Sequence, residues 1–131
     1  MTIATYDTSK AARATKDQAA FDAVKVGDVF VSSWGYDQTN IDFYEVVAKT
    51  KARIKVRPIA STVIESTRYS DEVVPAKGHY TGPAVVKAVR ASSWRHDFDP
   101  TKDAYFSVND YSTASKWTGG ARHQTSYWAG H

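Results

Sequence analysis

The sequence contains no cysteine among its 131 residues. That absence excludes a disulfide scaffold, a zinc site with thiolate ligands and a cysteine nucleophile, and it fits a reducing compartment. No apolar run approaches the roughly 18 residues of a membrane-spanning helix, and residues 1–16 lack the hydrophobic stretch of a signal peptide. We therefore expect a soluble, cytoplasmic protein with no membrane partner.

A strong excess of one charge is also missing. The chain carries 17 Lys and Arg against 14 Asp and Glu, a formal net charge of +3. This mild excess permits a nucleic-acid or acidic-protein partner without requiring one. A chain of this length folds as one domain with one modest core. We expect a single domain over residues 1–131, with a helical segment at 1–24 and a β-barrel at 25–131.

Aromatic residues are plentiful, at 13% of the chain, and aromatic and β-branched residues favour strands. One helix is nevertheless expected, from Thr8 to Val24, because its alanines are strong helix formers and no Gly or Pro interrupts them. Asp7 or Thr8 is the expected N-cap. Phe21 and Val24 share a short apolar face, so the C-terminal half of the helix should dock on the core.

From Val29 onward the hydrophobic pattern has the period of two that is typical of half-buried strands. Strands are expected at Val29–Ser33, Asn40–Lys49, Ala52–Ile59 with a bent continuation at Ser61–Tyr69, Ala84–Ala91, Ala104–Val108, Ser112–Trp117 and Gln124–Trp128, with loops at Asp71–Gly82 and Ser92–Asp103. The pattern predicts that the core contains Val29, Val31, Ile41, Phe43, Val47, Ile54, Val56 and Val85. Short strands separated by turn signals favour a mainly β fold, a small, strongly bent antiparallel barrel resembling an SH3 domain, with one N-terminal α-helix.

A basic stripe is the first candidate binding feature. It occupies every second position of the hairpin expected between the second and third strands and consists of Lys49, Lys51, Arg53, Lys55 and Arg57. Because strand side chains alternate between faces, Ile54 and Val56 should face the core while the cations face solvent. Such a row can follow a phosphate backbone. The alternative interpretation is the polar outer face that antiparallel sheets commonly have.

The loop Ser32–Asn40, with sequence SSWGYDQTN, is the second candidate. Its aromatic side chains can stack on a base or anchor a partner, and its polar side chains can form hydrogen bonds within the loop. The candidate binding residues here are Trp34, Tyr36, Asp37, Gln38 and Asn40. The alternative is a structural loop whose tryptophan packs over the end of the barrel.

Two His-x-Thr triplets, His79–Thr81 and His123–Thr125, are the third feature. Paired triplets of this kind mark a class of phosphoesterases in which two histidines act as base and acid across one phosphate. The first triplet lies in a Gly- and Pro-rich segment, however, which is unlike the strands of that class. The chain also has no nucleophile elbow and no glycine-rich phosphate loop. We therefore expect no catalytic residues, no cofactor and no metal site.

The segment from Lys25 to Ala60 contains, in order, VGD, SWGYDQTN, DFY and a VV strand that leads into the basic hairpin. It resembles a family of small, uncharacterised proteins of bacteriophages, plasmids and other mobile elements. The ending, Ala104 to His131, is also similar to theirs, although Thr118-Gly119 stands where Asp-Gly is more usual. The resemblance implies a mobile-element origin and the cytoplasm of a host cell. It carries no agreed activity, so it assigns no catalytic residue.

These features together favour a binding protein that is not an enzyme. The leading hypothesis is a mobile-element protein that antagonises a host defence or nucleic-acid machine, as anti-CRISPR and anti-restriction inhibitors do. Its partner would be a host defence protein or a ribonucleoprotein. The alternative is a module that binds DNA or RNA directly, and the third hypothesis is the His-x-Thr phosphoesterase. The oligomeric state does not follow from the sequence.

Overall fold

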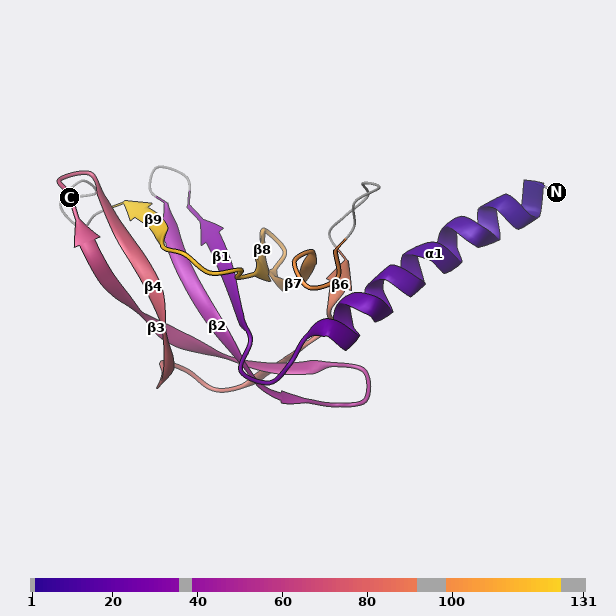
Figure 1. Cartoon of the computed structure of the whole chain (residues 1–131), viewed down its shortest axis with the longest axis horizontal. Helices are drawn as coiled ribbons and strands as arrows, with labels where there is room; N and C mark the ends of the chain where they lie inside the picture. The colour runs from indigo at the N-terminus through magenta and orange to yellow at the C-terminus, as the bar shows by residue number, and fades with distance from the viewer. Residues whose placement is uncertain (1, 36–38, 92–98, 126–131) are drawn as a thin grey trace.

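The computed structural model shows a mainly β protein with one helix (Figure 1). It describes residues 2–35, 39–91 and 99–125, with side chains from Arg13 onward. The elements are α1 (Thr2–Ala23), β1 (Val29–Trp34), β2 (Asn40–Lys49), β3 (Ile54–Ser66), β4 (Ser70–Tyr80), β5 (Val85–Lys87), β6 (Arg90–Ala91), β7 (Ala104–Asn109), β8 (Ser112–Lys116) and β9 (Arg122–Thr125).

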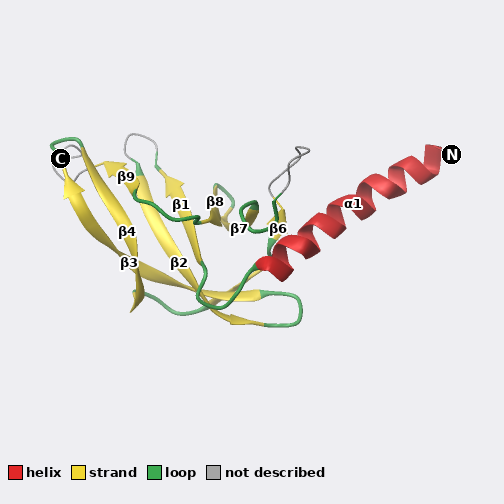
Figure 2. Cartoon of the chain, viewed as in Figure 1, coloured by secondary structure: helices red, strands yellow, loops and turns green. Residues whose placement is uncertain are grey.

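The strands form one antiparallel sheet in the order β6-β7-β8-β1-β2-β3-β4-β9, and β5 pairs with β3 outside this path. The sheet curls into a half-barrel, with the helix at one side (Figure 2). Strong twist and the register shifts within β2–β3 and β3–β4 accompany this curvature. The predicted fold class, a small bent antiparallel sheet with one N-terminal helix, is confirmed.

The helix is longer than the sequence predicts. It begins at Thr2, so the expected start at Thr8 with a cap at Asp7 or Thr8 is wrong. No Gly or Pro interrupts residues 2–8 either, so the helix extends back through those positions. Its N-terminal half projects away from the sheet (Figure 1). Docking by the C-terminal half is confirmed, because Phe21 and Val24 are buried.

Two hydrophobic clusters pack against opposite faces of the sheet. Phe30 belongs to the cluster beneath the helix and packs on Phe106 with ring centroids 5.1 Å apart. Its neighbours Val29 and Val31 belong to the other cluster, together with Phe43. This alternation follows from strand geometry, in which successive side chains point to opposite faces. The sheet is therefore buried on both faces over its central strands.

Six of the eight predicted core residues are buried, and two are not. Val47 is only half-buried, because the register between β2 and β3 shifts between Val46 and Ala48 and Val46 takes the core position instead. Val85 is 41% exposed, because β5 is a three-residue strand that pairs with β3 outside the main strand order.

The expected loop at Asp71–Gly82 is wrong, since β4 covers Ser70–Tyr80. Pro75 lies opposite Ser61 in the ladder, and the register shifts between Ile59 and Ser61. The shift accommodates Gly78, whose φ of 82° is a conformation that favours glycine. A bulged strand tolerates the proline and glycine that otherwise indicate a loop.

Two other strands differ from their expected bounds. The single strand expected at Ala84–Ala91 is divided into β5 and β6, and β9 begins at Arg122 rather than Gln124.

Candidate binding surfaces

The alternation predicted for the basic stripe is confirmed at its centre. Ile54 and Val56 are fully buried, whereas Arg53 and Lys55 are exposed. Lys51, at the turn between β2 and β3, is exposed as well. These three cations are therefore available to a partner. The two ends of the stripe have different roles.

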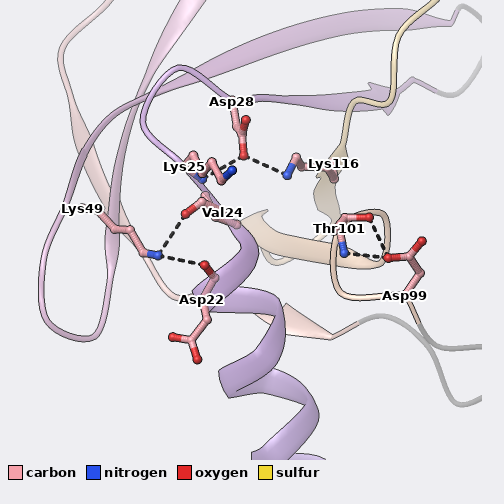
Figure 3. Close-up of polar contacts among 8 residues, drawn as sticks. All are labelled: Asp22, Val24, Lys25, Asp28, Lys49, Asp99, Thr101 and Lys116. Atoms are coloured by element: carbon pink, nitrogen blue, oxygen red, sulfur yellow. Dashed lines mark hydrogen bonds and ion pairs between the residues drawn. The ribbon is translucent and has the colours of Figure 1, made fainter.

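Lys49 stabilises the end of the helix. Its Nζ donates a 2.9 Å hydrogen bond to the Val24 carbonyl and a 3.5 Å bond to the Asp22 carbonyl (Figure 3). The same ammonium lies 4.4 Å from the centre of the Phe21 ring. A cation at a helix C-terminus satisfies free carbonyl groups and interacts favourably with the helix dipole. Lys49 therefore belongs to the fold rather than to a solvent-facing row.

A second ionic contact in the same region fixes the chain between helix and sheet. The Asp28 carboxylate accepts a hydrogen bond from the backbone N–H of Lys25 and pairs with Lys116 of β8 at 2.8 Å (Figure 3). The Lys116 side chain is 11% exposed, so this pair is well shielded from solvent. It joins the turn after α1 to β8.

Arg57 is also held by the protein itself. Its Nε donates a 2.9 Å hydrogen bond to the Gly82 carbonyl, and its guanidinium stacks 4.1 Å from the centre of the Tyr80 ring. Tyr80 in turn donates to the buried carboxylate of Glu45, the residue directly opposite Arg57 in the sheet. Arg57 is half-buried as a result. The basic stripe thus contributes three exposed cations rather than five.

A pocket of about 470 Å³ lies beside the exposed cations. Its lining comprises Arg53, Val86, Lys87, Ala88, Arg90, Tyr105, Ser107 and Thr113, and we call it the basic pocket. Lys55 is not part of this lining, but it is the direct cross-strand partner of Val86, which is. Among the residues that the structure describes, none that lines this pocket carries a carboxylate. Three guanidinium or ammonium groups and three hydroxyl groups therefore surround one space.

The cations of the basic pocket are positioned by separate elements. Lys87 donates a 3.2 Å hydrogen bond from Nζ to the Val108 carbonyl of β7. Arg90 lies 3.6 Å from the Asp17 carboxylate of the helix, and its side chain is 61% exposed. Asp17 also accepts a hydrogen bond from the backbone N–H of Ala91, which fixes β6 against the helix. The Asp17 carboxylate offsets part of the Arg90 charge, and the charges of Arg53 and Lys87 keep the pocket positive overall.

The SSWGYDQTN loop is only partly described, because Tyr36, Asp37 and Gln38 lie outside the described residues. Trp34 is 49% exposed, and Asn40 is half-buried directly opposite it in the sheet. Thr39 pairs with Thr125 of β9 through two hydrogen bonds of 2.9 and 2.8 Å. The loop therefore contacts β9, and its described aromatic residue is open to solvent.

Trp34 lines a second pocket, of about 690 Å³, that we call the aromatic cleft. Its lining comprises Ser33, Trp34, Gly35, Asp42, Tyr44, Val108, Asn109, Tyr111 and Ser112. The Asp42 carboxylate accepts a hydrogen bond from the indole N–H of Trp34. Burial, together with the nearby charge of Asp42, raises the pKa of the Tyr44 hydroxyl above its usual value of 10.0.

The two His-x-Thr triplets lie near opposite ends of β4. The second triplet is on β9, which pairs with the start of β4, and the first is at the end of β4 itself. His123 is the cross-strand partner of Glu72 and lies 3.5 Å from its carboxylate. His79 lies next to Tyr80, the last residue of β4. Seven residue steps separate Glu72 from His79, which corresponds to about 23 Å in a regular strand. The register shift shortens this path, but a separation of this order is much larger than one phosphate group, which a two-histidine mechanism requires both imidazoles to reach.

Of the residues that line the two pockets, the sequence pattern singled out Arg53 in the basic pocket and Trp34 in the aromatic cleft, and it missed the others. Lys87 and Arg90 sit in a valine-rich segment whose cations gave no sign of converging on Arg53. Tyr111 is 96% exposed. It directly follows Asn109 and Asp110, residue types that favour turns, so the sequence did contain a signal for an outward aromatic residue at this position. Asn109 holds that turn by accepting hydrogen bonds at its side-chain oxygen from the backbone N–H groups of Tyr111 and Ser112.

Comparisons with family models, curated proteins and solved structures found no match to the chain. The resemblance to mobile-element proteins therefore stays a prediction. Within the described part of the chain, α1 is too polar to cross a bilayer as a helix. The same residues include no group of three His, Asp or Glu side chains arranged to hold a metal ion.

Proposed function

We propose that this protein is a non-enzymatic binding protein that contacts the phosphate backbone of a nucleic acid through its basic pocket and the adjoining cations Lys51 and Lys55. One observation carries the proposal. Arg53 and, more distant in the sequence, the neighbouring Lys87 and Arg90 line one pocket, and none of the described residues that line it carries a carboxylate. Charged side chains that serve only to keep a protein surface solvated are not expected to gather around one pocket.

The chemistry of the lining suits phosphate. Arginine binds phosphate oxygens through paired N–H donors, and hydroxyl groups are frequent phosphate contacts. Ser107 and Thr113 lie directly opposite each other on β7 and β8, so their side chains project from the same face. Tyr105 is half-buried beside them and adds an aromatic surface on which a base can stack.

The proposal is tested by fluorescence anisotropy with labelled single-stranded DNA, single-stranded RNA and duplex DNA at about 50 mM salt. We expect all three to bind in about the micromolar range that is typical of electrostatic binding. Arg53→Gln should weaken binding to each by a similar factor. The matched control is Lys77→Gln, which removes one exposed charge from β4 and should change binding little. Absence of binding by the parent protein at this salt concentration contradicts the proposal.

A second candidate function is antagonism of a host defence protein, and one observation favours it. Val85 and Val86 are 41% and 53% exposed, and Val86 lies directly opposite Lys55. Val86 therefore lies on the same face as Lys55, and an exposed valine beside a cation suits an acidic protein groove with apolar walls. Pull-down from nuclease-treated host lysate separates the candidates. A partner that survives nuclease and is lost with Val86→Ser favours the protein target, whereas loss of all partners on nuclease treatment favours direct nucleic-acid binding.

A further inference from the structure

The aromatic cleft differs from the basic pocket in the sign of its charge. Three aromatic side chains line it, contributed by β1 (Trp34), by β2 (Tyr44) and by the turn between β7 and β8 (Tyr111). Among the described residues that line it, Asp42 is the one charged residue and none is a cation. An anion surrounded by aromatic faces attracts a cation and repels a phosphate.

The cleft is held in place by contacts within the protein. The indole N–H of Trp34 donates to Asp42 Oδ2, which fixes the orientation of the ring relative to the carboxylate. Tyr44 packs edge-on against Phe106, with ring centroids 5.6 Å apart, and is half-buried. Two aromatic walls are thus rigid, and rigid walls reduce the entropy cost of binding.

Tyr111 forms the open side. Asn109 accepts hydrogen bonds from the backbone N–H of Tyr111 at 2.8 Å and from the backbone N–H and hydroxyl of Ser112 at 3.0 and 3.1 Å. The turn is therefore ordered by its own side chain, yet it leaves the Tyr111 ring almost entirely in solvent. An aromatic ring held outward at the edge of a cleft is available to cover a ligand.

We propose that the aromatic cleft binds the guanidinium group of an arginine side chain presented by a partner protein. A guanidinium is planar and weakly hydrated, stacks on aromatic faces and donates to a carboxylate. It therefore matches both parts of the lining, whereas a nucleotide matches only the aromatic part and meets the Asp42 charge. This proposal does not depend on phosphate binding at the basic pocket, because it uses different residues and the opposite charge.

The test follows the indole N–H signal of Trp34 in ¹⁵N-labelled protein, assigned with Trp34→Phe, during titration with a capped Gly-Arg-Gly peptide. We expect a saturable shift, and about fivefold or weaker binding for the same peptide with citrulline, which keeps the shape but lacks the charge. Asp42→Asn should weaken arginine binding by about fivefold or more. The matched control Asp110→Asn removes a neighbouring exposed carboxylate that does not line the cleft and should change binding less than about twofold.

Three outcomes would overturn the proposal. Equal binding of the arginine and citrulline peptides means that the cleft does not recognise charge. Adenosine monophosphate binding more tightly than the arginine peptide at the Trp34 signal makes the cleft a nucleobase site. Unchanged arginine binding in both Asp42→Asn and Tyr111→Ala places the peptide elsewhere. Since Tyr111 is almost fully exposed, its truncation leaves the fold intact, and this variant remains informative even if Asp42→Asn unfolds the protein.

Discussion

The hydroxyl of Tyr80 donates a 2.9 Å hydrogen bond to Oε2 of Glu45, joining the end of β4 to the middle of β2. Glu45 is only 8% exposed, and its other oxygen accepts a 3.0 Å bond from the backbone N–H of Gly78. Arg57 stacks on the Tyr80 ring. These contacts keep a buried carboxylate satisfied, and they keep the Arg57 guanidinium at the sheet rather than at the binding surface.

The first prediction concerns the pH dependence of stability. The hydrogen bond to Glu45 is the largest of the effects that raise the pKa of Tyr80 above 10.0. A tyrosine with a raised pKa in the folded state stabilises the protein fully below the unfolded pKa, and this contribution is lost as the pH rises through the folded pKa. Urea unfolding between pH 8 and 11 should therefore show a loss of stability that is smaller in Tyr80→Phe. Tyr44→Phe serves as a comparison, since its pKa is also raised. Identical pH profiles for the parent and Tyr80→Phe would refute the assignment.

The second prediction separates the two ends of the basic hairpin. Lys49→Met keeps the apolar part of the side chain but removes the ammonium that binds the Val24 carbonyl. We expect a loss of about 1–2 kcal/mol in the free energy of unfolding. Lys51→Met, at an exposed turn position, should change it by less than about 0.5 kcal/mol. Chemical denaturation measures both, and equal effects would mean that Lys49 does not cap the helix.

The third prediction compares two valines that face each other across β3 and β5. Val56 is fully buried, whereas its partner Val85 is 41% exposed. Val56→Ala should cost about 2 kcal/mol or more, because it removes buried methyl groups and leaves a cavity. Val85→Ala should cost less than about 1 kcal/mol. Thermal or denaturant unfolding gives both values. A larger loss at Val85 than at Val56 would contradict the difference in burial between the two side chains.

Local pattern determines much of this fold. The alternation around Ile54 and Val56 and the apolar end of the helix at Phe21 follow directly from strand and helix periodicity, and both were predictable. The bulge that exchanges Val47 for Val46 was not, because one extra residue in a strand leaves no mark in a period-two pattern. The same limit applies to Pro75, whose residue type favours a loop although the bulged strand β4 contains it.

The candidate surfaces show a similar division. Alternation places Arg53 and Lys55 outside, and it does so correctly. It cannot show that Lys49 meets the end of the helix, since that contact depends on where two distant segments pack. The alternation pattern also cannot predict that Arg90 and Arg53 line the same pocket. Their proximity follows from the curvature of the whole sheet rather than from any local sequence pattern.

The salt dependence of nucleic-acid binding is the most direct test of the basic pocket. The combined variant Arg53→Gln, Lys87→Gln and Arg90→Gln should flatten the plot of log K against log salt by up to about 0.7–0.9 units per lost phosphate contact, so by about 2–3 units in all. A control with the same charge change, Arg68→Gln, Lys77→Gln and Arg122→Gln, removes cations that do not line the pocket and should leave the slope within about one unit. A parent slope that persists in the first variant, or that falls equally in both, would contradict a phosphate site in the basic pocket.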